Sequence, residues 1–149
     1  MFVIDTNILV DAANDESAFH LPCRALLANC RDQSGAWFLT WGVCYEFLRV
    51  ATHPKIFDRP LSAANAWRFI EDLIGVSAVG VLTPTDRHKL VAAKVFAEMP
   101  SLAGNIMHDA ETAILMREHG IKTIYTRDMD FHRFGFLQVI DPTTALAKR

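Results

Sequence analysis

Short apolar runs separated by stretches of helical spacing are the feature that most constrains the fold of this chain. The first run, FVIDTNILV (residues 2–10), is rich in β-branched residues and carries polar residues at its centre, and runs of the same kind follow at 36–40, 79–82, 122–126 and 137–141. Buried parallel strands have this continuous apolar character, and the crossover that joins two of them is usually a helix. The pattern predicts an α/β fold with a central, mainly parallel sheet flanked by helices on both faces.

The segments between these runs carry helical spacing and recognisable helix ends. Helices are predicted at about 20–30 and at 41–51, and three more are predicted to begin after the N-caps Ser62, Thr85 and Asn105. Serine, threonine and asparagine accept hydrogen bonds from first-turn amides, and Gly120 is a suitable helix stop. No repeat or linker interrupts the pattern, so we expect residues 1–149 to form a single domain.

Charge and hydropathy exclude several classes of protein. The net charge of −2 argues against a constitutively basic nucleic-acid binder, although bound metal ions or local basic clusters would still allow a nucleic-acid substrate. No run reaches the roughly 18 apolar residues of a membrane helix, and the N-terminus lacks the basic region of a signal peptide. We therefore expect a cytoplasmic protein that does not bind membranes.

The cysteines and histidines do not predict a disulfide framework or a zinc site. Cys23, Cys30 and Cys44 are odd in number and lack the CxxC spacing, and the six histidines show no HxxxH spacing. Free cysteine is among the most frequently buried residue types, so we expect all three in the core, in a reducing compartment.

Five acidic residues stand out by their positions relative to the predicted elements. Asp5 and Asp128 follow strands, Asp130 comes two residues after Asp128, Glu46 lies within a mostly apolar helix, and Asp109 lies in the first turns of another. Each has an ordinary explanation as a cap, turn or solvated residue. Parallel strands, however, deliver the residues after their carboxyl ends to one edge of the sheet, where ligands bind.

Carboxylates gathered at that edge would raise one another's pKa values unless a cation were present. Oxygen-only ligands favour Mg²⁺ or Mn²⁺ over zinc. Such a site is typical of enzymes that hydrolyse phosphate esters, in which the ion activates water and stabilises the leaving oxygen.

Four segments, taken in order, resemble the PIN-domain nucleases, and within them the VapC-type toxins of prokaryotic toxin–antitoxin pairs. They are VIDTNILVD, CYEFLRV with its single Glu46, HDAETAILMREHG and IYTRDMDFHRF, which together span nearly the whole chain. The resemblance implies a Mg²⁺- or Mn²⁺-dependent endoribonuclease. It makes Asp5 the central metal ligand, adds Glu46, Asp109 and Asp128 as catalytic and metal-binding acids, and leaves Asp130 as a secondary candidate.

The same resemblance implies supporting residues and partners. Thr6 and Asn7 would orient Asp5 and the bound water, and Thr126 would orient Asp128 or a phosphate. His108 and Arg127 receive no role. The implied partners are an RNA substrate, a cognate antitoxin protein and a second copy of the chain in a homodimer.

Aromatic and basic residues give these partners weak additional support. Trp37, Trp41 and Trp67 are typical of interfaces, although core packing explains most such residues more simply. Basic residues near the predicted site favour RNA, with solvated surface charge an equal explanation. These are Arg49, Lys55, Arg59, Arg127 and Arg133.

Other interpretations remain open from the sequence alone. The order of His88, His108–Asp109 and Asp128 is also that of HD-type phosphohydrolases, which are entirely helical. The DTN segment is similar to haloacid dehalogenase-type phosphatases, but these need a second aspartate where this chain has Asn7. A non-toxin PIN nuclease of RNA processing and a non-enzymatic PIN-fold binding module are further alternatives.

Overall fold

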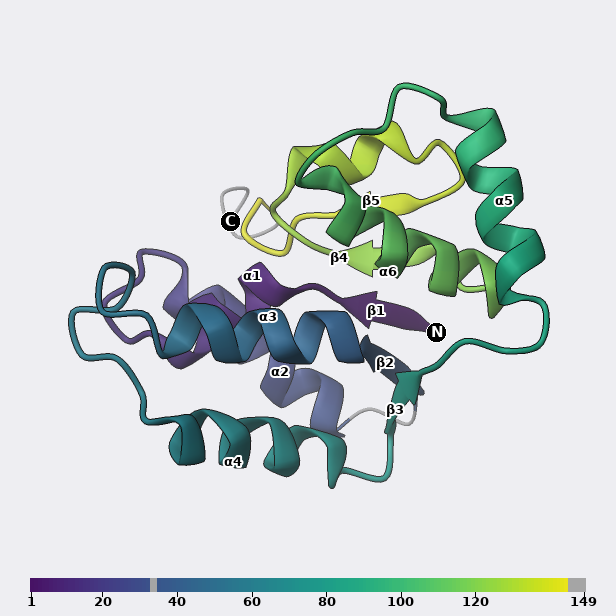
Figure 1. Ribbon diagram of the computed structural model, residues 1–149. Coiled ribbons are helices and arrows are strands. Elements are labelled where there is room, and N and C mark those ends of the chain that lie inside the picture. Colours follow the sequence, from purple (N-terminus) through teal and green to yellow (C-terminus); the bar gives the residue numbers. More distant parts are fainter. Residues whose placement is uncertain (33–34, 145–149) are drawn as a thin grey trace.

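A computed structural model describes residues 1–32 and 35–144 (Figure 1). Within them, five strands form one sheet in the order β3–β2–β1–β4–β5, and every neighbouring pair is parallel. The strands are β1 (Phe2–Ile4), β2 (Trp37–Thr40), β3 (Val79–Leu82), β4 (Thr123–Tyr125) and β5 (Gln138–Ile140). The predicted parallel α/β fold is confirmed, and the sheet excludes the all-helical HD-type alternative.

Six α-helices and one 3₁₀ helix occur in the same described residues. They are α1 (Thr6–Ala13), α2 (His20–Asp32), α3 (Trp41–Ala51), α4 (Ala63–Ile74), α5 (His88–Glu98), α6 (Ile106–Glu118) and the 3₁₀ helix η1 (Met129–Arg133). The bounds predicted for α3 are confirmed. Ser62 caps α4 by accepting a hydrogen bond from the Asn65 amide at 3.1 Å, and Gly120 follows α6 with a φ of +71°, which glycine adopts without strain.

The strand predicted across residues 2–10 is wrong beyond Ile4, where the chain turns into α1. The carboxylate of Asp5 accepts a hydrogen bond from the Thr6 amide at 2.7 Å and so caps this helix. Capping satisfies an amide that would otherwise lack a partner, which favours a helix start even among β-branched residues. The buried residues Ile8, Leu9 and Ala12 then lie on one helical face.

The predicted capping role of Thr85 is also wrong, because α5 begins three residues later, after Arg87. The backbone amide of Thr85 instead donates to the Glu118 carboxylate at 2.6 Å, and the Thr85 hydroxyl donates to the same oxygen. The Thr85 hydroxyl oxygen does accept a hydrogen bond from the Arg87 amide at 3.2 Å, but Arg87 precedes the first helical residue, His88.

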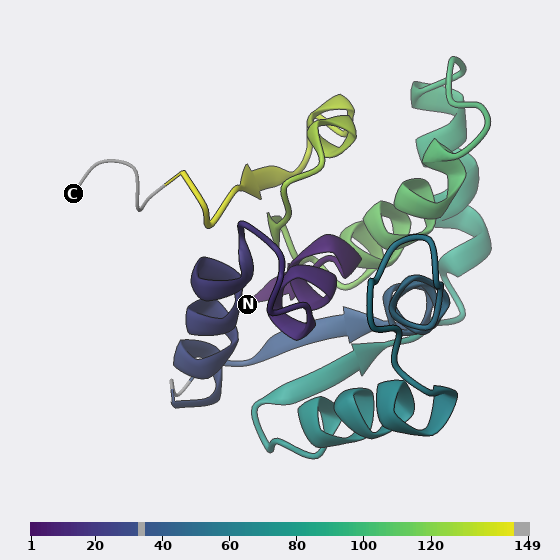
Figure 2. The ribbon, with the colours of Figure 1, turned by 90° about the vertical axis from the view of Figure 1, so that its left-hand side faces the viewer.

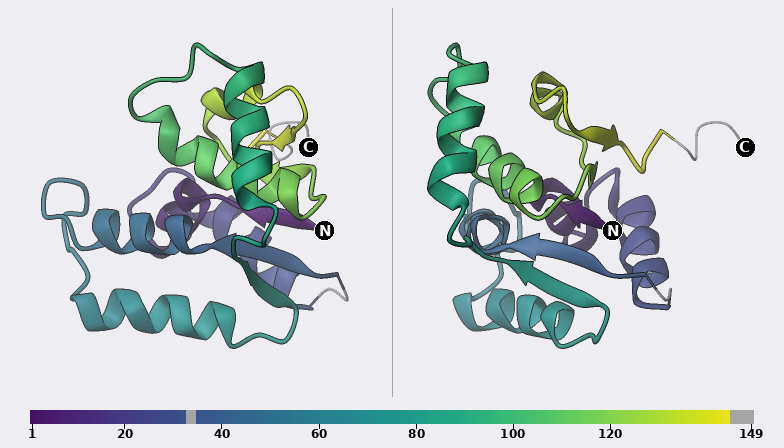
Figure 3. Two further views of the ribbon diagram at one scale, coloured as in Figure 1. Left: turned by 45° about the vertical axis from the view of Figure 1, so that its right-hand side comes forward. Right: turned by 90° about the vertical axis from the view of Figure 1, so that its right-hand side faces the viewer.

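Both faces of the sheet are covered, as predicted. Ile4 lies on one face, in a core with residues of α1 to α4, whereas Val3 points to the other face, in a core with α6 and residues around η1. Figures 2 and 3 show α4 and α5 on opposite sides of the sheet. The short strands therefore deliver their ends to a rigid edge between two packed layers.

The cysteines and tryptophans of the described chain lie partly as expected. The three cysteines are free and buried in the first core, which confirms their predicted place. Trp37 is fully buried, whereas Trp41 is 39% exposed and stacks on Trp67 with ring centroids 6.5 Å apart. Across residues 1–32 and 35–144, no helix combines the length and the apolar character needed to cross a membrane.

Candidate active site

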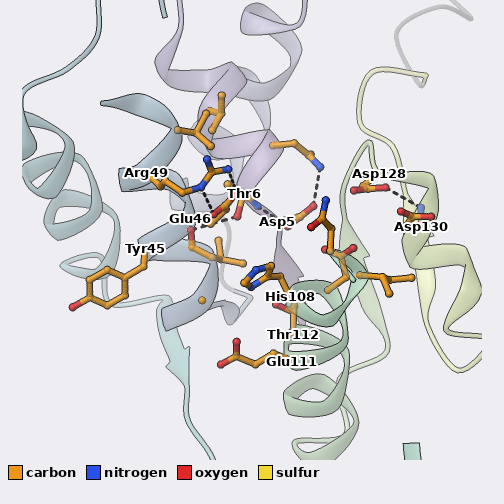
Figure 4. A pocket seen from close by; sticks show the side chains of 18 of the residues that line it. Asp5, Thr6, Tyr45, Glu46, Arg49, His108, Glu111, Thr112, Asp128 and Asp130 are labelled. Atoms are coloured by element: carbon orange, nitrogen blue, oxygen red, sulfur yellow. Dashed lines mark hydrogen bonds and ion pairs between the residues drawn. The ribbon is translucent and has the colours of Figure 1, made fainter. Parts of the chain in front are cut away.

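A pocket of about 1040 Å³ lies where the carboxyl ends of the strands meet the helices (Figure 4). All five acidic residues singled out from the sequence line it. They are Asp5, Glu46, Asp109, Asp128 and Asp130. The strand pairing continues into the residues that follow β1 and β4. The Asp5 amide donates to the Tyr125 carbonyl at 3.1 Å, and the Thr126 amide donates to the Ile140 carbonyl at 3.0 Å.

Asp5 is the most buried of the five acidic residues and is held through both carboxylate oxygens. Its side chain is 7% exposed; Oδ1 accepts from the Thr6 amide, and Oδ2 accepts from Asn7 Nδ2 at 2.8 Å and from Thr126 Oγ1 at 2.6 Å. Burial, together with the charges of Asp128 and Glu46, raises the pKa of Asp5 to about 6 against the lowering effect of the hydrogen bonds from Thr126 and Thr6. The carboxylate is thus fixed in place, and no positive group among the described residues balances its charge.

Asn7 and Thr126 also bond to each other and to the loop after β4. Asn7 Nδ2 donates to Thr126 Oγ1 at 2.8 Å, the Asp128 amide donates to the same hydroxyl at 2.9 Å, and Asn7 Oδ1 accepts from the Arg127 amide at 3.1 Å. Asn7 thus contacts the Asp5 carboxylate, and Thr126 contacts both Asp5 and the backbone of Asp128, while their supporting roles stay predictions. Thr6 contributes its backbone amide, whereas its hydroxyl donates to the Val43 carbonyl at 3.4 Å.

Three of the carboxylates that line the pocket form a tight group. One carboxylate oxygen each of Asp109, Asp128 and Asp130 lies within 4.8 Å of the other two, so Asp130, the secondary candidate, lies beside two of the four primary acids. Burial raises the pKa of Asp109 to about 7, and the charges of Asp5, Asp128, Asp130 and Glu46 add to the effect. Asp128 also caps η1 by accepting from the Asp130 amide at 2.8 Å.

Glu46 lines the same pocket but is paired with an arginine one turn along α3. Its Oε2 accepts from Arg49 Nε at 2.8 Å, and its Oε1 accepts from Arg49 Nη2 at 2.6 Å. This interaction with Arg49 lowers the pKa of Glu46, and the nearby His108 contributes in the same direction. Glu46 therefore stays ionised, with its charge already balanced by the protein.

The donor set fits a hard divalent cation. The pocket presents carboxylates from four separate elements, and the raised pKa values of Asp5 and Asp109 have uncompensated negative charge among their causes. Carboxylate oxygens are the ligands that Mg²⁺ and Mn²⁺ prefer, and a cation would relieve the repulsion among them. Asp5, Glu46, Asp109, Asp128 and Asp130 are the residues that could hold it.

Arg127, which received no role from the sequence, connects the loop after β4 to α1. Its Nη1 lies 2.7 Å from Asp11 Oδ2, and its guanidinium carbon lies 3.3 Å from the centre of the Phe19 ring. Sequence reasoning missed Asp11 because residues 2–10 were assigned to a strand. On the observed helix Asp11 follows Asn7 by four residues and therefore shares its face, which a helical assignment would have indicated.

Among the described residues, two of the five basic candidates for RNA contact line the pocket. Arg49 and Arg127 do so, and the lining does not include Lys55, Arg59 or Arg133. His108, the other residue without a predicted role, also lines the pocket.

Comparisons with known proteins give one consistent family. The PIN domain family matches residues 2–137. Ribonuclease VapC48 of Mycobacterium tuberculosis is 33% identical over 138 residues, which cover 93% of this chain and 94% of that protein, and Ribonuclease VapC37 of the same species is 30% identical over 146 residues, which cover 98% and 100%.

Two solved structures share the fold at low sequence identity. VapC20 of M. tuberculosis, a toxin that cleaves the sarcin–ricin loop, superposes with a TM-score of 0.69 at 20% identity and covers 95% of this chain and 100% of its own. VapBC-1 of nontypeable Haemophilus influenzae gives 0.64 at 20% identity, with 95% and 98% covered.

Proposed function

This chain belongs to the PIN-domain family, and on that premise we propose that it is a metal-dependent endoribonuclease and the toxin of a VapBC-type toxin–antitoxin pair. The observation that carries the proposal is the convergence of five carboxylates from four separate elements on one pocket at the sheet edge. The ribonuclease names of the relatives support RNA as the substrate. The proposal treats residues 1–149 as one ribonuclease domain that acts in the cytoplasm.

Asp5, Glu46, Asp109 and Asp128 are the proposed catalytic and metal-binding acids, with Asp130 at their side. When bound, Mg²⁺ or Mn²⁺ supplies a Lewis acid that lowers the pKa of a coordinated water and neutralises charge on the phosphate. The chain's own contribution is to fix Asp5 through Asn7 and Thr126 and to fix Asp128 through its cap on η1. In-line attack of water on the phosphodiester would leave a 5′-phosphate and a 3′-hydroxyl.

The proposed protein partners are an antitoxin and a second copy of the chain. VapBC assemblies among the structural neighbours support the antitoxin. Within α5, which is described in full, Val95 is the single buried residue, whereas Leu90 is 73% exposed and Phe96 is 41% exposed. Large exposed apolar side chains on one helix are typical of interfaces, so we assign the exposed surface of α5 around Leu90 to the homodimer.

Of the alternatives, none has a specific observation in its favour. A phosphatase of the haloacid dehalogenase type needs an acid at residue 7, where Asn7 instead donates to Asp5. A binding module without activity has no need for this set of carboxylates. A non-toxin PIN nuclease would share the pocket, so a cellular experiment has to separate it from a toxin.

The decisive experiment induces the chain alone in bacteria beside Asp5→Asn, which removes a charge without changing shape. We expect growth arrest with the wild type and none with the variant, and sequencing of RNA ends should give cuts that require Asp5. Asp58→Asn, an exposed residue outside the pocket lining, is the matched control and should still arrest growth. Soluble wild type that cleaves RNA without arresting growth would favour the non-toxin nuclease, and absence of metal-dependent cleavage would refute the enzyme.

The dimer is tested separately by light scattering of the purified protein. Leu90→Glu should convert a dimer to a monomer, whereas Leu21→Glu, at a 77% exposed site on α2, should not. A monomeric wild type would contradict the assignment.

A further inference from the structure

Two arginines in the described chain line the pocket, and they are held very differently. The side chain of Arg127 is 27% exposed, and Asp11 and the Phe19 ring hold its guanidinium. Its backbone amide is bonded to Asn7 as well. Arg127 is thus part of the frame of the pocket, and its guanidinium is already occupied.

Arg49 is the freer of the two. Its side chain is 60% exposed, and its hydrogen bonds to described residues all go to Glu46, whose side chain is 40% exposed. Figure 4 shows the two side chains facing each other on the wall of the pocket. Exposed ion pairs of this kind contribute little to stability, so Arg49 is not needed there to hold the fold together.

The pair conflicts with the proposed role of Glu46. Arg49 engages both carboxylate oxygens of Glu46, and those are the oxygens that Glu46 would offer to a metal ion. When Glu46 serves as a metal ligand, the guanidinium of Arg49 loses at least one of its two hydrogen bonds to Glu46. A free guanidinium carries two parallel donors at the spacing that matches two oxygens of a phosphate.

We propose that Arg49 exchanges Glu46 for a backbone phosphate of the RNA when the carboxylate site is loaded. This inference rests on the proposed nuclease function. It assigns Arg49 as a substrate-binding residue for the phosphodiester, and it gives a chain of net charge −2 with an acidic pocket one positive contact for an anion. In the unloaded state Arg49 serves instead to neutralise Glu46.

The exchange predicts opposite effects of one substitution on two ligands. In Arg49→Ala, Glu46 is relieved of its partner, so Mn²⁺ measured by calorimetry without RNA should bind as tightly as in the wild type or a few-fold tighter. A labelled 12-nucleotide single-stranded RNA of mixed sequence, measured by anisotropy with Ca²⁺ in place of Mn²⁺, should bind about tenfold more weakly. The slope of log affinity against log salt should fall by about one phosphate contact.

Arg117→Ala is the matched control. Arg117 is also bound through two nitrogens to one glutamate, Glu98, at 2.6 and 3.1 Å, but it lies outside the pocket lining. It should leave both affinities unchanged. Arg49→Lys keeps the charge but loses the paired donors, so its RNA affinity should lie between those of wild type and Arg49→Ala, which also covers the case in which the alanine variant folds poorly.

Three outcomes overturn the inference. Unchanged RNA affinity in Arg49→Ala means that Arg49 does not bind phosphate. A parallel loss of Mn²⁺ and RNA affinity means that Arg49 only positions Glu46. If the wild type binds RNA but not Mn²⁺, there is no metal-loaded state and the proposed exchange does not occur. If the wild type binds Mn²⁺ yet cleaves no RNA, the nuclease function is refuted, but the Mn²⁺ affinities of wild type and Arg49→Ala can still be compared.

Discussion

Asn7 and Thr126 are 119 residues apart in the chain, yet the side-chain amide of Asn7 donates to the Thr126 hydroxyl at 2.8 Å. Both side chains also donate to the same oxygen of Asp5, which closes a triangle around the buried carboxylate. The amide uses both of its hydrogens, and the hydroxyl uses its one donor and two acceptor positions. The orientation of Asp5 therefore depends on both neighbours.

Replacing Asn7 with alanine should loosen this triangle. Thr126 and Asp5 would each lose a buried partner, so we expect a loss of about 1–3 kcal/mol in the free energy of unfolding. Substitutions that disturb the partners of metal ligands typically weaken metal affinity or activity by roughly 10- to 100-fold. Urea unfolding and Mn²⁺ calorimetry measure the two effects.

Thr126 provides the matched comparison for the same triangle. Thr126→Ser keeps the hydroxyl and should behave nearly as wild type, whereas Thr126→Val keeps the shape and should resemble Asn7→Ala. Equal behaviour of the serine and valine variants would show that the hydroxyl does not orient Asp5.

The raised pKa values predict how stability depends on pH without metal. Burial and neighbouring carboxylates raise the pKa of Asp109 from 3.8 to about 7. The folded state therefore binds more protons than the unfolded state between these values, and ionisation of Asp109 lowers stability as pH rises from about 4 to 7. Asp109→Asn removes this loss. With EDTA present, the melting temperature of the variant relative to that of wild type should therefore increase as pH rises across that range. A constant difference between the two would contradict the assigned shift.

Metal should reverse that trend. Mn²⁺ binds the ionised carboxylates, so binding must release the protons that Asp5 and Asp109 retain near pH 6. We expect Mn²⁺ to raise the melting temperature more at pH 8 than at pH 5.5, and EDTA to abolish the difference. Asp5→Asn should remove most of the effect, and an equal stabilisation of wild type and Asp5→Asn would mean that Mn²⁺ binds elsewhere.

The sequence was sufficient to predict the five strands of the sheet and the five acidic residues that line the pocket. Apolar runs located the strands, and the rule that parallel strands end at one edge brought Asp5 and Asp128 together. The family resemblance drawn from four short segments was confirmed by the match across residues 2–137.

Other features of the site depend on contacts that no local pattern encodes. The β-branched residues after Asp5 predicted a strand, but the carboxylate caps a helix there, because tertiary packing overrides local propensity. Because of that error, the sequence did not predict that Asp11 shares a helical face with Asn7. Glu46 and Arg49 are three residues apart on a helix, so the sequence allowed an ion pair between them. The sequence did not show whether the two side chains face the pocket.

The pair of Asp11 and Arg127 gives the last prediction, on the loop that carries Asp128. Their side chains are only 13% and 27% exposed, and the 2.7 Å contact joins α1 to this loop across 116 residues of sequence. Removing either partner leaves the other charge partly buried, so Asp11→Ala and Arg127→Ala should each destabilise the fold and weaken Mn²⁺ binding. The double variant should lose less than the sum, with a coupling of about 1–2 kcal/mol in urea unfolding. The pair of Arg59 and Glu16, 3.5 Å apart and largely exposed, is the matched control and should show a coupling close to zero. If the two cycles gave the same coupling, Asp11 and Arg127 would be an ordinary surface pair, and the loop with Asp128 would have to be held by Thr126 and Asn7 alone.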